Sequence, residues 1–302
     1  MSGLCLGTVQ LGMKYGVNNE LGRQPTRKES YDVLQAALEL GIDCFDTASA
    51  YGNAETVLGD FGLSKRYDAH KRPARIISKL RPDCLDDAET VLIEIRDSLS
   101  RLHTPKLYGY MLHRASDLFR TGIMEGLARA KECGFVEHIG VSVYEPQEAM
   151  DVVRDGRLDM IQVPYNVLDR RLDKSGFFLL AKKGRLQVYA RSAFLQGLLL
   201  MEPEQAEQKV SGSGIYVRQF QHIAAKHGFT SGEAAFLWSY CHPAVDCLVF
   251  GVDTVEQLRE NQKIVDKAAD FSACREELRR IFFDADVPDE IIVPSLWKRA
   301  VG

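Results

Sequence analysis

The chain repeats one short pattern that restricts its fold more than any other feature. A helix-like stretch ends at a glycine, and an apolar, β-branched run begins within a few residues. Glycine ends helices because it tolerates the left-handed backbone conformation, after which the chain can enter a strand. The pattern occurs at Gly41, Gly134, Gly156 and Gly184. Helices that alternate with short apolar strands predict βαβ units and a parallel sheet with both faces covered.

Eight apolar runs are the expected strands: Leu4–Val9, Cys44–Thr47, Arg75–Lys79, Leu107–Leu112, His138–Ser142, Met160–Val163, Leu186–Arg191 and Cys247–Phe250. In 302 residues this gives about 38 residues per strand–helix unit, which predicts a closed (β/α)8 TIM barrel. The competing fold is an open doubly wound sheet, whose usual GxGxxG fingerprint is absent from the sequence. We expect one barrel domain over residues 1–302, with a flexible loop around 197–214 and a C-terminal tail from about 285.

The sequence also predicts where two helices begin. Thr26 and Glu29 have the spacing of a capping box, and Glu145-Pro146 places proline in a first turn.

Composition excludes several classes of partner. The net charge of −4 gives no basic excess to neutralise phosphates, so no nucleic-acid partner is expected. No apolar run approaches the roughly 20 residues needed to cross a bilayer, and the N-terminus does not resemble a secretion signal. The seven cysteines are scattered, with no CxxC spacing. A structural metal site or disulfide framework is therefore not expected, and a reducing cytoplasm is the expected compartment.

Polar residues with complementary chemistry follow or end three neighbouring strands. Asp46 ends the second expected strand, and Tyr51 follows five residues later. Lys79 ends the third strand and His113 follows the fourth. Because active sites of such barrels gather at the C-terminal ends of the strands, and adjacent strands lie about 5 Å apart, these four side chains are expected to converge.

Together the four residues suit the reduction of a carbonyl by hydride transfer. That reaction needs an acid to protonate the developing alkoxide, and a tyrosine with a pKa near 10 is a poor acid at neutral pH. A lysine ammonium within about 4–6 Å is expected to lower the pKa of Tyr51. A carboxylate would keep the lysine charged, and a histidine can orient the substrate oxygen. Any one of these residues alone has an ordinary structural explanation, such as a helix cap or a core aromatic.

Four segments, in this order, resemble the aldo-keto reductase family: GTVQLGMKYGVNN, GIDCFDTASAYGNAETVLG, ISKL and MLHR. The resemblance runs from Leu4 to about Asn261. It implies Tyr51 as general acid and base, Lys79 and Asp46 as the pair that tunes it, and His113 as the residue that orients the substrate. It also implies NADP(H) or NAD(H) as cofactor, and no metal.

The resemblance also indicates where the nicotinamide end of the cofactor binds. Ser142 and Gln162 match the family's carboxamide ligands, whereas Val143 stands where the family usually has asparagine. Arg191 replaces the aromatic residue that commonly stacks on the nicotinamide, and a planar guanidinium can also stack. Three following residues are expected near the pyrophosphate: Ser192, Leu195 and Gly197.

At the adenosine end, three residues of one helix match the family pattern: Gln257, Glu260 and Asn261. The loop from Gly251 to Asp253 lacks the basic residue often used for the 2′-phosphate of NADP. Asp253 would repel that phosphate and could accept a hydrogen bond from a free ribose hydroxyl. We therefore expect weak discrimination in favour of NADP, although Arg259 could compensate.

The resulting hypothesis is an oxidoreductase that transfers a hydride between NAD(P)H and an aldehyde or ketone. Lys14 and Arg114 suggest a sugar-like or otherwise polar substrate. One alternative is a cofactor-sensing subunit with little turnover, favoured by the changes at Val143 and Arg191. Another is a metal-dependent barrel enzyme, disfavoured because only His113 and Asp46 qualify as ligands at strand ends. The sequence does not indicate the oligomeric state.

Overall fold

Eight parallel strands close into one barrel in the computed structural model, which describes residues 2–15 and 21–297. Each strand pairs with the next along the chain, and β8 pairs with β1. The strands are β1 Gly3–Gly7, β2 Cys44–Asp46, β3 Arg75–Lys79, β4 Leu107–Leu112, β5 Val136–Ser142, β6 Met160–Pro164, β7 Gln187–Arg191 and β8 Cys247–Gly251. The predicted (β/α)8 TIM barrel is confirmed, and no predicted strand end is displaced by more than two residues.

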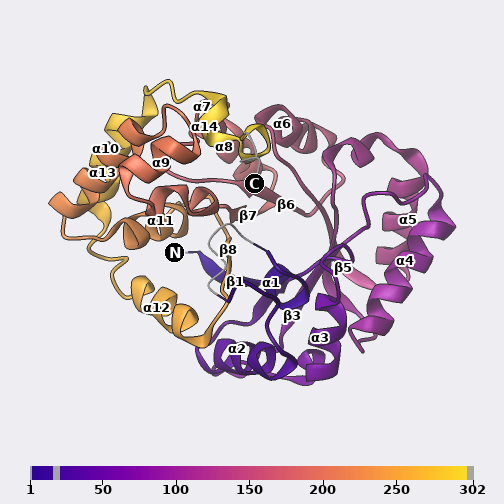
Figure 1. The fold of residues 1–302 in the computed structure, drawn as a ribbon. Coiled ribbons are helices and arrows are strands. Elements are labelled where there is room, and N and C mark those ends of the chain that lie inside the picture. The colour runs from indigo at the N-terminus through magenta and orange to yellow at the C-terminus, as the bar shows by residue number, and fades with distance from the viewer. Residues whose placement is uncertain (1, 16–20, 298–302) are drawn as a thin grey trace.

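Helices surround the barrel on its outside (Figure 1). They are α1 Val9–Gly12, α2 Arg27–Glu39, α3 Ala54–Phe61, α4 Ala88–Arg101, α5 Thr121–Glu132, α6 Pro146–Asp155, α7 Arg171–Lys174, α8 Phe177–Lys183, α9 Pro203–Lys209, α10 Gly214–Lys226, α11 Ser231–Tyr240, α12 Val255–Val265, α13 Ser272–Phe283 and α14 Asp289–Ile292. Short 3-10 turns lie at 63–65, 115–119, 195–200 and 294–296. None of the helices within residues 2–15 and 21–297 is long and apolar enough to cross a membrane.

The predicted helix signals are largely confirmed. Thr26 and Glu29 form the capping box of α2, and α6 begins at Pro146 after its N-cap Glu145. Gly41, Gly134 and Gly156 have positive φ, as expected for glycines that end helices. The prediction for Gly184 was wrong: it has φ −77°, and the next residue, Arg185, takes the left-handed conformation at φ 57°.

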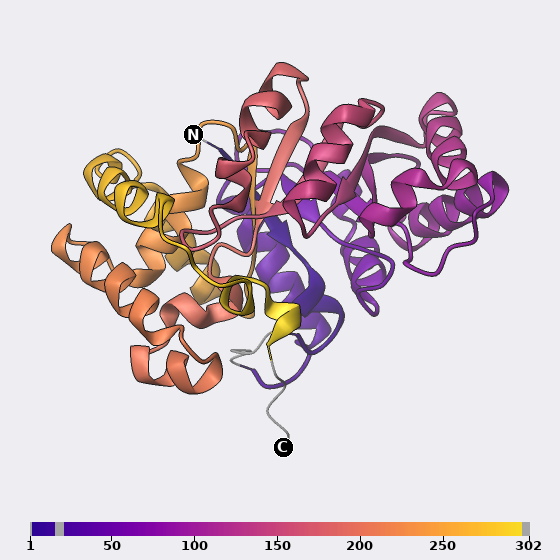
Figure 2. The ribbon, with the colours of Figure 1, turned by 90° about the horizontal axis from the view of Figure 1, so that it is seen from above.

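Residues 197–214 are more regular than the expected loop. The segment contains the end of a 3-10 turn and helix α9, which packs against α10. Figure 2 shows α9, α10, α11 and α13 gathered on one side of the barrel. The described part of the expected C-terminal tail, up to residue 297, contains α14, and the indole N–H of Trp297 donates to the Ile291 carbonyl at 3.1 Å.

A separate apolar cluster fills the barrel. Its buried members are Cys5, Cys44, Ile77, Met111, Met160, Tyr189, Cys247 and Val249. Side chains alternate along a strand, so residues two positions apart point to the same side. A residue two positions after a member of this cluster therefore faces the interior one layer higher, at the C-terminal mouth of the barrel.

Candidate active site

The layer at the mouth of the barrel is polar. Counting two positions on from Cys44, Ile77, Met111, Met160, Tyr189 and Val249 gives Asp46, Lys79, His113, Gln162, Arg191 and Gly251. Six of the fifteen site residues predicted from the sequence thus occupy equivalent positions on six of the strands. The predicted motif GTVQLGMKYGVNN is covered only in part, because its residues 16–19 lie outside the described residues.

Lys79 is the centre of the hydrogen-bonded cluster. Its ammonium donates to both carboxylate oxygens of Asp46 at 2.7 Å and to the Thr47 carbonyl at 2.9 Å. Its Nζ also lies 3.5 Å from the Tyr51 hydroxyl. Lys79 and Asp46 are almost completely buried, with 0% and 3% of their surface exposed. The structure therefore brings together the phenol, ammonium and carboxylate that the sequence predicted.

The ammonium is held in its charged form. Burial acts to lower the pKa of Lys79, but the Asp46 carboxylate, the Tyr51 side chain and their hydrogen bonds outweigh it, so the pKa is raised above its ordinary value. A buried charge is tolerated only when it is paired and hydrogen-bonded, and Asp46 and the Thr47 carbonyl provide those partners. The Thr47 carbonyl was missed in the sequence, because a backbone acceptor has no residue-type signal.

The pKa of Tyr51 differs from the expectation. Burial raises the pKa of this phenol above its ordinary value, and the nearby Lys79 cation only partly opposes that rise. The expected net lowering by lysine was therefore wrong for this structure, because desolvation of the hydroxyl is the larger effect. Tyr51 remains protonated at neutral pH and can donate a proton.

His113 packs edge-on against the Tyr51 ring, with centroids 5.9 Å apart and an interplanar angle of 88°. Burial, aided by the Lys79 cation, lowers the pKa of His113 to about 4. The imidazole is therefore neutral at pH 7. Its Nδ1 is buried without a hydrogen-bond partner among the described residues, so a polar atom at the mouth is available for a ligand.

Gln162 and Ser142 connect the cluster to the opposite wall of the barrel. The Gln162 amide donates to Asp46 Oδ1 at 2.8 Å, and the Ser142 hydroxyl lies 3.5 Å from the Gln162 Oε1. The sequence placed Gln162 with the cofactor and missed its bond to Asp46. The sequence signal that could have revealed this bond is the two-residue period of β6, which places Gln162 on the interior side, level with the predicted catalytic residues.

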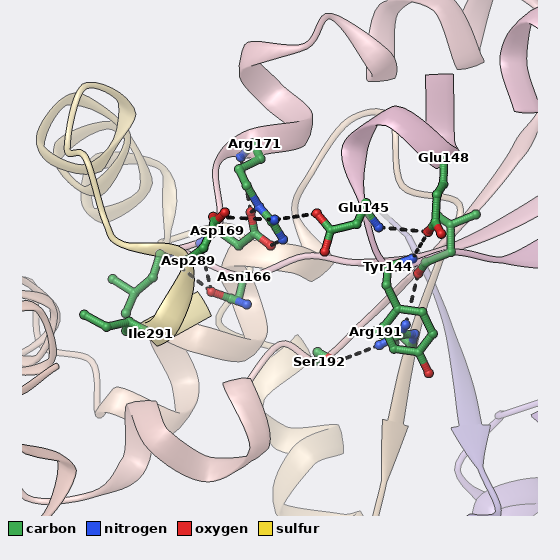
Figure 3. Close-up of polar contacts among 12 residues, drawn as sticks. Tyr144, Glu145, Glu148, Asn166, Asp169, Arg171, Arg191, Ser192, Asp289 and Ile291 are labelled. Atoms are coloured by element: carbon green, nitrogen blue, oxygen red, sulfur yellow. Dashed lines mark hydrogen bonds and ion pairs between the residues drawn. The ribbon is translucent and has the colours of Figure 1, made fainter. Parts of the chain in front are cut away.

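Arg191 is held by residues that the sequence did not single out for that purpose. Its guanidinium donates to the Val143 carbonyl at 3.0 Å and to the Ser192 hydroxyl at 3.2 Å, and it lies 4.3 Å from the centroid of the Tyr144 ring (Figure 3). Tyr144 therefore covers one face of the guanidinium. A nicotinamide ring could therefore stack only on the opposite face of the guanidinium, so the stacking role expected for Arg191 is possible on one face only.

The residues expected near a pyrophosphate form a tight turn after β7. Ser192, Leu195 and Gly197 all have positive φ. The amides of Leu195 and Gly197 donate within the turn, to the carbonyls of Ser192 and Phe194 at 2.9 Å each. These two amides therefore cannot bind a phosphate as they stand, and of the three residues Ser192 alone presents a side-chain donor.

The residues expected near adenosine lie around the start of α12. The Gln10 side-chain amide lies directly against Gly251, so a larger residue at this position would have to displace that amide. The Gln257 side-chain oxygen accepts a hydrogen bond from the Asp253 backbone N–H at 2.7 Å, and the Gln257 backbone N–H donates to the hydroxyl of the N-cap Thr254 at 3.3 Å. Three side chains differ in exposure: Asp253 is buried, Asn261 is half-buried and Glu260 is exposed.

The fold is a (β/α)8 barrel with a buried polar cluster at its mouth, and comparison with protein families shows to which family the chain belongs. The model of the aldo/keto reductase family matches residues 3–276. The chain belongs to the aldo/keto reductase family and is an NAD(P)-dependent oxidoreductase that acts on carbonyl groups. No group of three or more histidine, cysteine or acidic side chains within residues 2–15 and 21–297 is arranged to hold a metal ion.

Several bacterial relatives share about a quarter of the sequence. An uncharacterised oxidoreductase, YqkF of Bacillus subtilis (strain 168), is 25% identical over 78% of this chain and 81% of its own length. L-glyceraldehyde 3-phosphate reductase of Escherichia coli (strain K12) is 25% identical, with coverage of 86% and 84%. NADH-specific methylglyoxal reductase of the same strain is 24% identical, with coverage of 86% and 89%.

Solved structures share the fold. The holo form of aldo-keto reductase AKR11C1 from Bacillus halodurans has a TM-score of 0.76 and 20% identity, over 96% of this chain and 94% of its own.

Proposed function

We propose that the chain interconverts small polar aldehydes or ketones and their alcohols, with Tyr51 as the residue that protonates the carbonyl oxygen. The observation that carries this proposal is the contact of the Tyr51 hydroxyl with Lys79 Nζ at 3.5 Å, while the same ammonium binds Asp46 at 2.7 Å. A bound NAD(P)H would supply the hydride. The chain's own residues would supply the proton and the geometry.

Proton delivery depends on the charges around the phenol. A protonated Tyr51 donates its proton to the carbonyl oxygen as negative charge develops there, and the adjacent ammonium stabilises the phenolate that remains. Asp46 keeps that ammonium charged and in place. The neutral His113 imidazole, with a buried ring nitrogen that lacks a partner in the described chain, would hydrogen-bond the same oxygen and orient it.

The donor set beside this cluster suits a nicotinamide carboxamide. A carboxamide both donates and accepts hydrogen bonds, and Ser142 and Gln162 offer a hydroxyl and an amide within 3.5 Å of each other. Arg191 and Ser192 stand next along the mouth, at β7 and its turn. We assign Ser142, Gln162, Arg191 and Ser192 to the nicotinamide and phosphate end, and Gln257, Glu260 and Asn261 to the adenosine end.

A short polar substrate agrees with the names of the relatives. The compounds named for two of them are L-glyceraldehyde 3-phosphate and methylglyoxal. Arg114, considered from the sequence as a substrate contact, is ion-paired with Asp117 at 3.2 Å, which weakens that part of the argument. Lys14 is exposed beyond the end of β1. The proposal of a short polar substrate is therefore supported mainly by the polar side chains at the mouth of the barrel, and only weakly by Arg114 and Lys14.

The direct test of this function is turnover. Purified chain is mixed with NADH or NADPH and 4-nitrobenzaldehyde, and loss of absorbance at the wavelength of the reduced cofactor is followed. Steady consumption of many equivalents is expected with at least one cofactor. Tight cofactor binding without turnover, across a panel of short aldehydes, ketones and sugars, would instead favour the cofactor-sensing alternative.

A further inference from the structure

Arg191 places a positive charge inside the mouth of the barrel. It ends β7 two residues after Tyr189, a member of the interior cluster, so its side chain starts on the inner wall. The guanidinium is tethered to the Val143 carbonyl and the Ser192 hydroxyl and stacked on Tyr144. All of these contacts are neutral. They fix the position of the guanidinium without cancelling its charge.

The acidic residues around this guanidinium are engaged elsewhere. Glu148 accepts the backbone N–H groups of Tyr144 and Glu145, and Glu145 pairs with Arg171 at 2.8 Å (Figure 3). In the part of the chain that the structure describes, Arg191 makes no salt bridge. No carboxylate of the described residues is therefore in direct contact with its guanidinium.

The other catalytic candidates at the mouth, Asp46, Lys79 and His113, carry no net charge together. Asp46 is matched by Lys79, and His113 is neutral at pH 7 because burial and then the Lys79 cation hold its pKa at about 4. One positive charge, that of Arg191, is left over among these groups. Its effect extends to the reacting groups, since the Arg191 cation adds to the lowering of the His113 pKa, after burial and Lys79.

A net positive charge distinguishes the two redox states of nicotinamide. The oxidised ring is a cation, whereas the reduced ring is neutral. Like charges repel strongly in a site shielded from water, and a neutral ring meets no such repulsion. We propose that Arg191 makes this chain bind NAD(P)H more tightly than NAD(P)+, by disfavouring the oxidised ring. The proposal rests on the proposed function, because it places the nicotinamide at this mouth.

Two consequences follow from thermodynamic linkage. Tighter binding of the reduced form shifts the potential of the bound cofactor upward, so Arg191 moves the equilibrium between bound carbonyl and alcohol toward the carbonyl. It also makes the reduced cofactor the form that occupies the free enzyme. A role in binding the phosphates would have neither consequence, because the phosphates carry the same charge in both redox states.

The test is the ratio of two dissociation constants, measured without any turnover. The full chain is titrated with NADH and NADPH by fluorescence, and with NAD+ and NADP+ by competition. The wild type is expected to favour the reduced form by at least about tenfold. Arg191→Gln is expected to lower that ratio about tenfold, whereas Arg191→Lys, which keeps the charge, retains most of it.

The control is Arg154→Gln, which removes an exposed arginine on α6 and is expected to leave the ratio unchanged. Equal affinity of the wild type for both redox states would overturn the proposal, whatever the variants do. A ratio that stays unchanged in Arg191→Gln while both affinities fall would overturn it too, and would indicate phosphate binding or a structural role. No binding of either form to the wild type would refute the proposed function itself.

Discussion

Both carboxylate oxygens of Asp46 accept hydrogen bonds from the Lys79 ammonium, at 2.7 Å each, and both residues are almost completely buried. This buried pair joins β2 to β3 at the mouth of the barrel. Because the ammonium also contacts the Tyr51 hydroxyl, the pair links the stability of the fold to the chemistry proposed for the site.

Removal of one member should leave an uncompensated buried charge. We expect Lys79→Met to lower the free energy of unfolding by about 3–5 kcal/mol, measured by urea denaturation at pH 7. Lys28→Met, in an exposed pair with Asp32, is the control and should barely change stability. The double variant Lys79→Met/Asp46→Leu should recover much of the loss while staying inactive. A single variant as stable as the wild type would show that the pair is not buried in solution.

His113 should make stability depend on mildly acidic pH. The pKa of His113 is lowered from its ordinary 6.5 to about 4, so the unfolded chain binds a proton in this window that the folded chain does not. Stability should therefore fall as pH drops from 6.5 toward 4, with a His113 contribution on the order of 2 kcal/mol.

Unfolding by urea at pH 7 and pH 4.5 measures this contribution. His113→Asn should reduce the loss of stability between the two pH values, whereas the exposed His222→Asn should not. Identical losses in His113→Asn and the wild type would contradict the assignment.

Arg171 forms ion pairs with acidic residues from three segments of the chain. It pairs with Asp169 at 2.9 Å, with Glu145 at 2.8 Å and with Asp289 of α14 at 3.6 Å (Figure 3). We expect Arg171→Ala to lower the free energy of unfolding by about 1–3 kcal/mol, since its buried partner Asp169 would lose a charged hydrogen bond. It should also speed limited proteolysis of the segment after residue 285. Asp289→Asn should have a smaller effect, because that contact is long and exposed. Equal effects of the two variants would locate the stabilisation in the tail contact.

Asp253 should influence the choice between NADH and NADPH. Its carboxylate lies in the loop between β8 and α12, where a 2′-phosphate would be repelled. Asp253→Asn should therefore strengthen NADPH binding several-fold relative to NADH, as measured by fluorescence titration. A strong preference of the wild type for NADPH that persists in Asp253→Asn would refute this role.

Local pattern is sufficient to predict the strands and the ring of residues at their ends. Glycines that end helices, apolar runs and the two-residue period of strands are all local properties of the sequence. Together they place Asp46, Lys79 and Gln162 near the C-terminal ends of their strands, at the same mouth of the barrel. Three-dimensional packing decides the features that were missed. The stack of Arg191 on Tyr144, the helix within residues 197–214 and the raised pKa of Tyr51 all depend on which groups pack together and exclude water.

The central claim is that the Tyr51 hydroxyl delivers the proton, and a single variant tests it most directly. In Tyr51→Phe, the ring that packs beside His113 and Lys79 is kept and only the hydroxyl is lost. Single-turnover oxidation of bound NADPH by an aldehyde should slow by about 10²–10⁴-fold, while the Kd for NADPH stays close to that of the wild type. A wild-type rate in Tyr51→Phe would contradict the mechanism, because another group would then be supplying the proton.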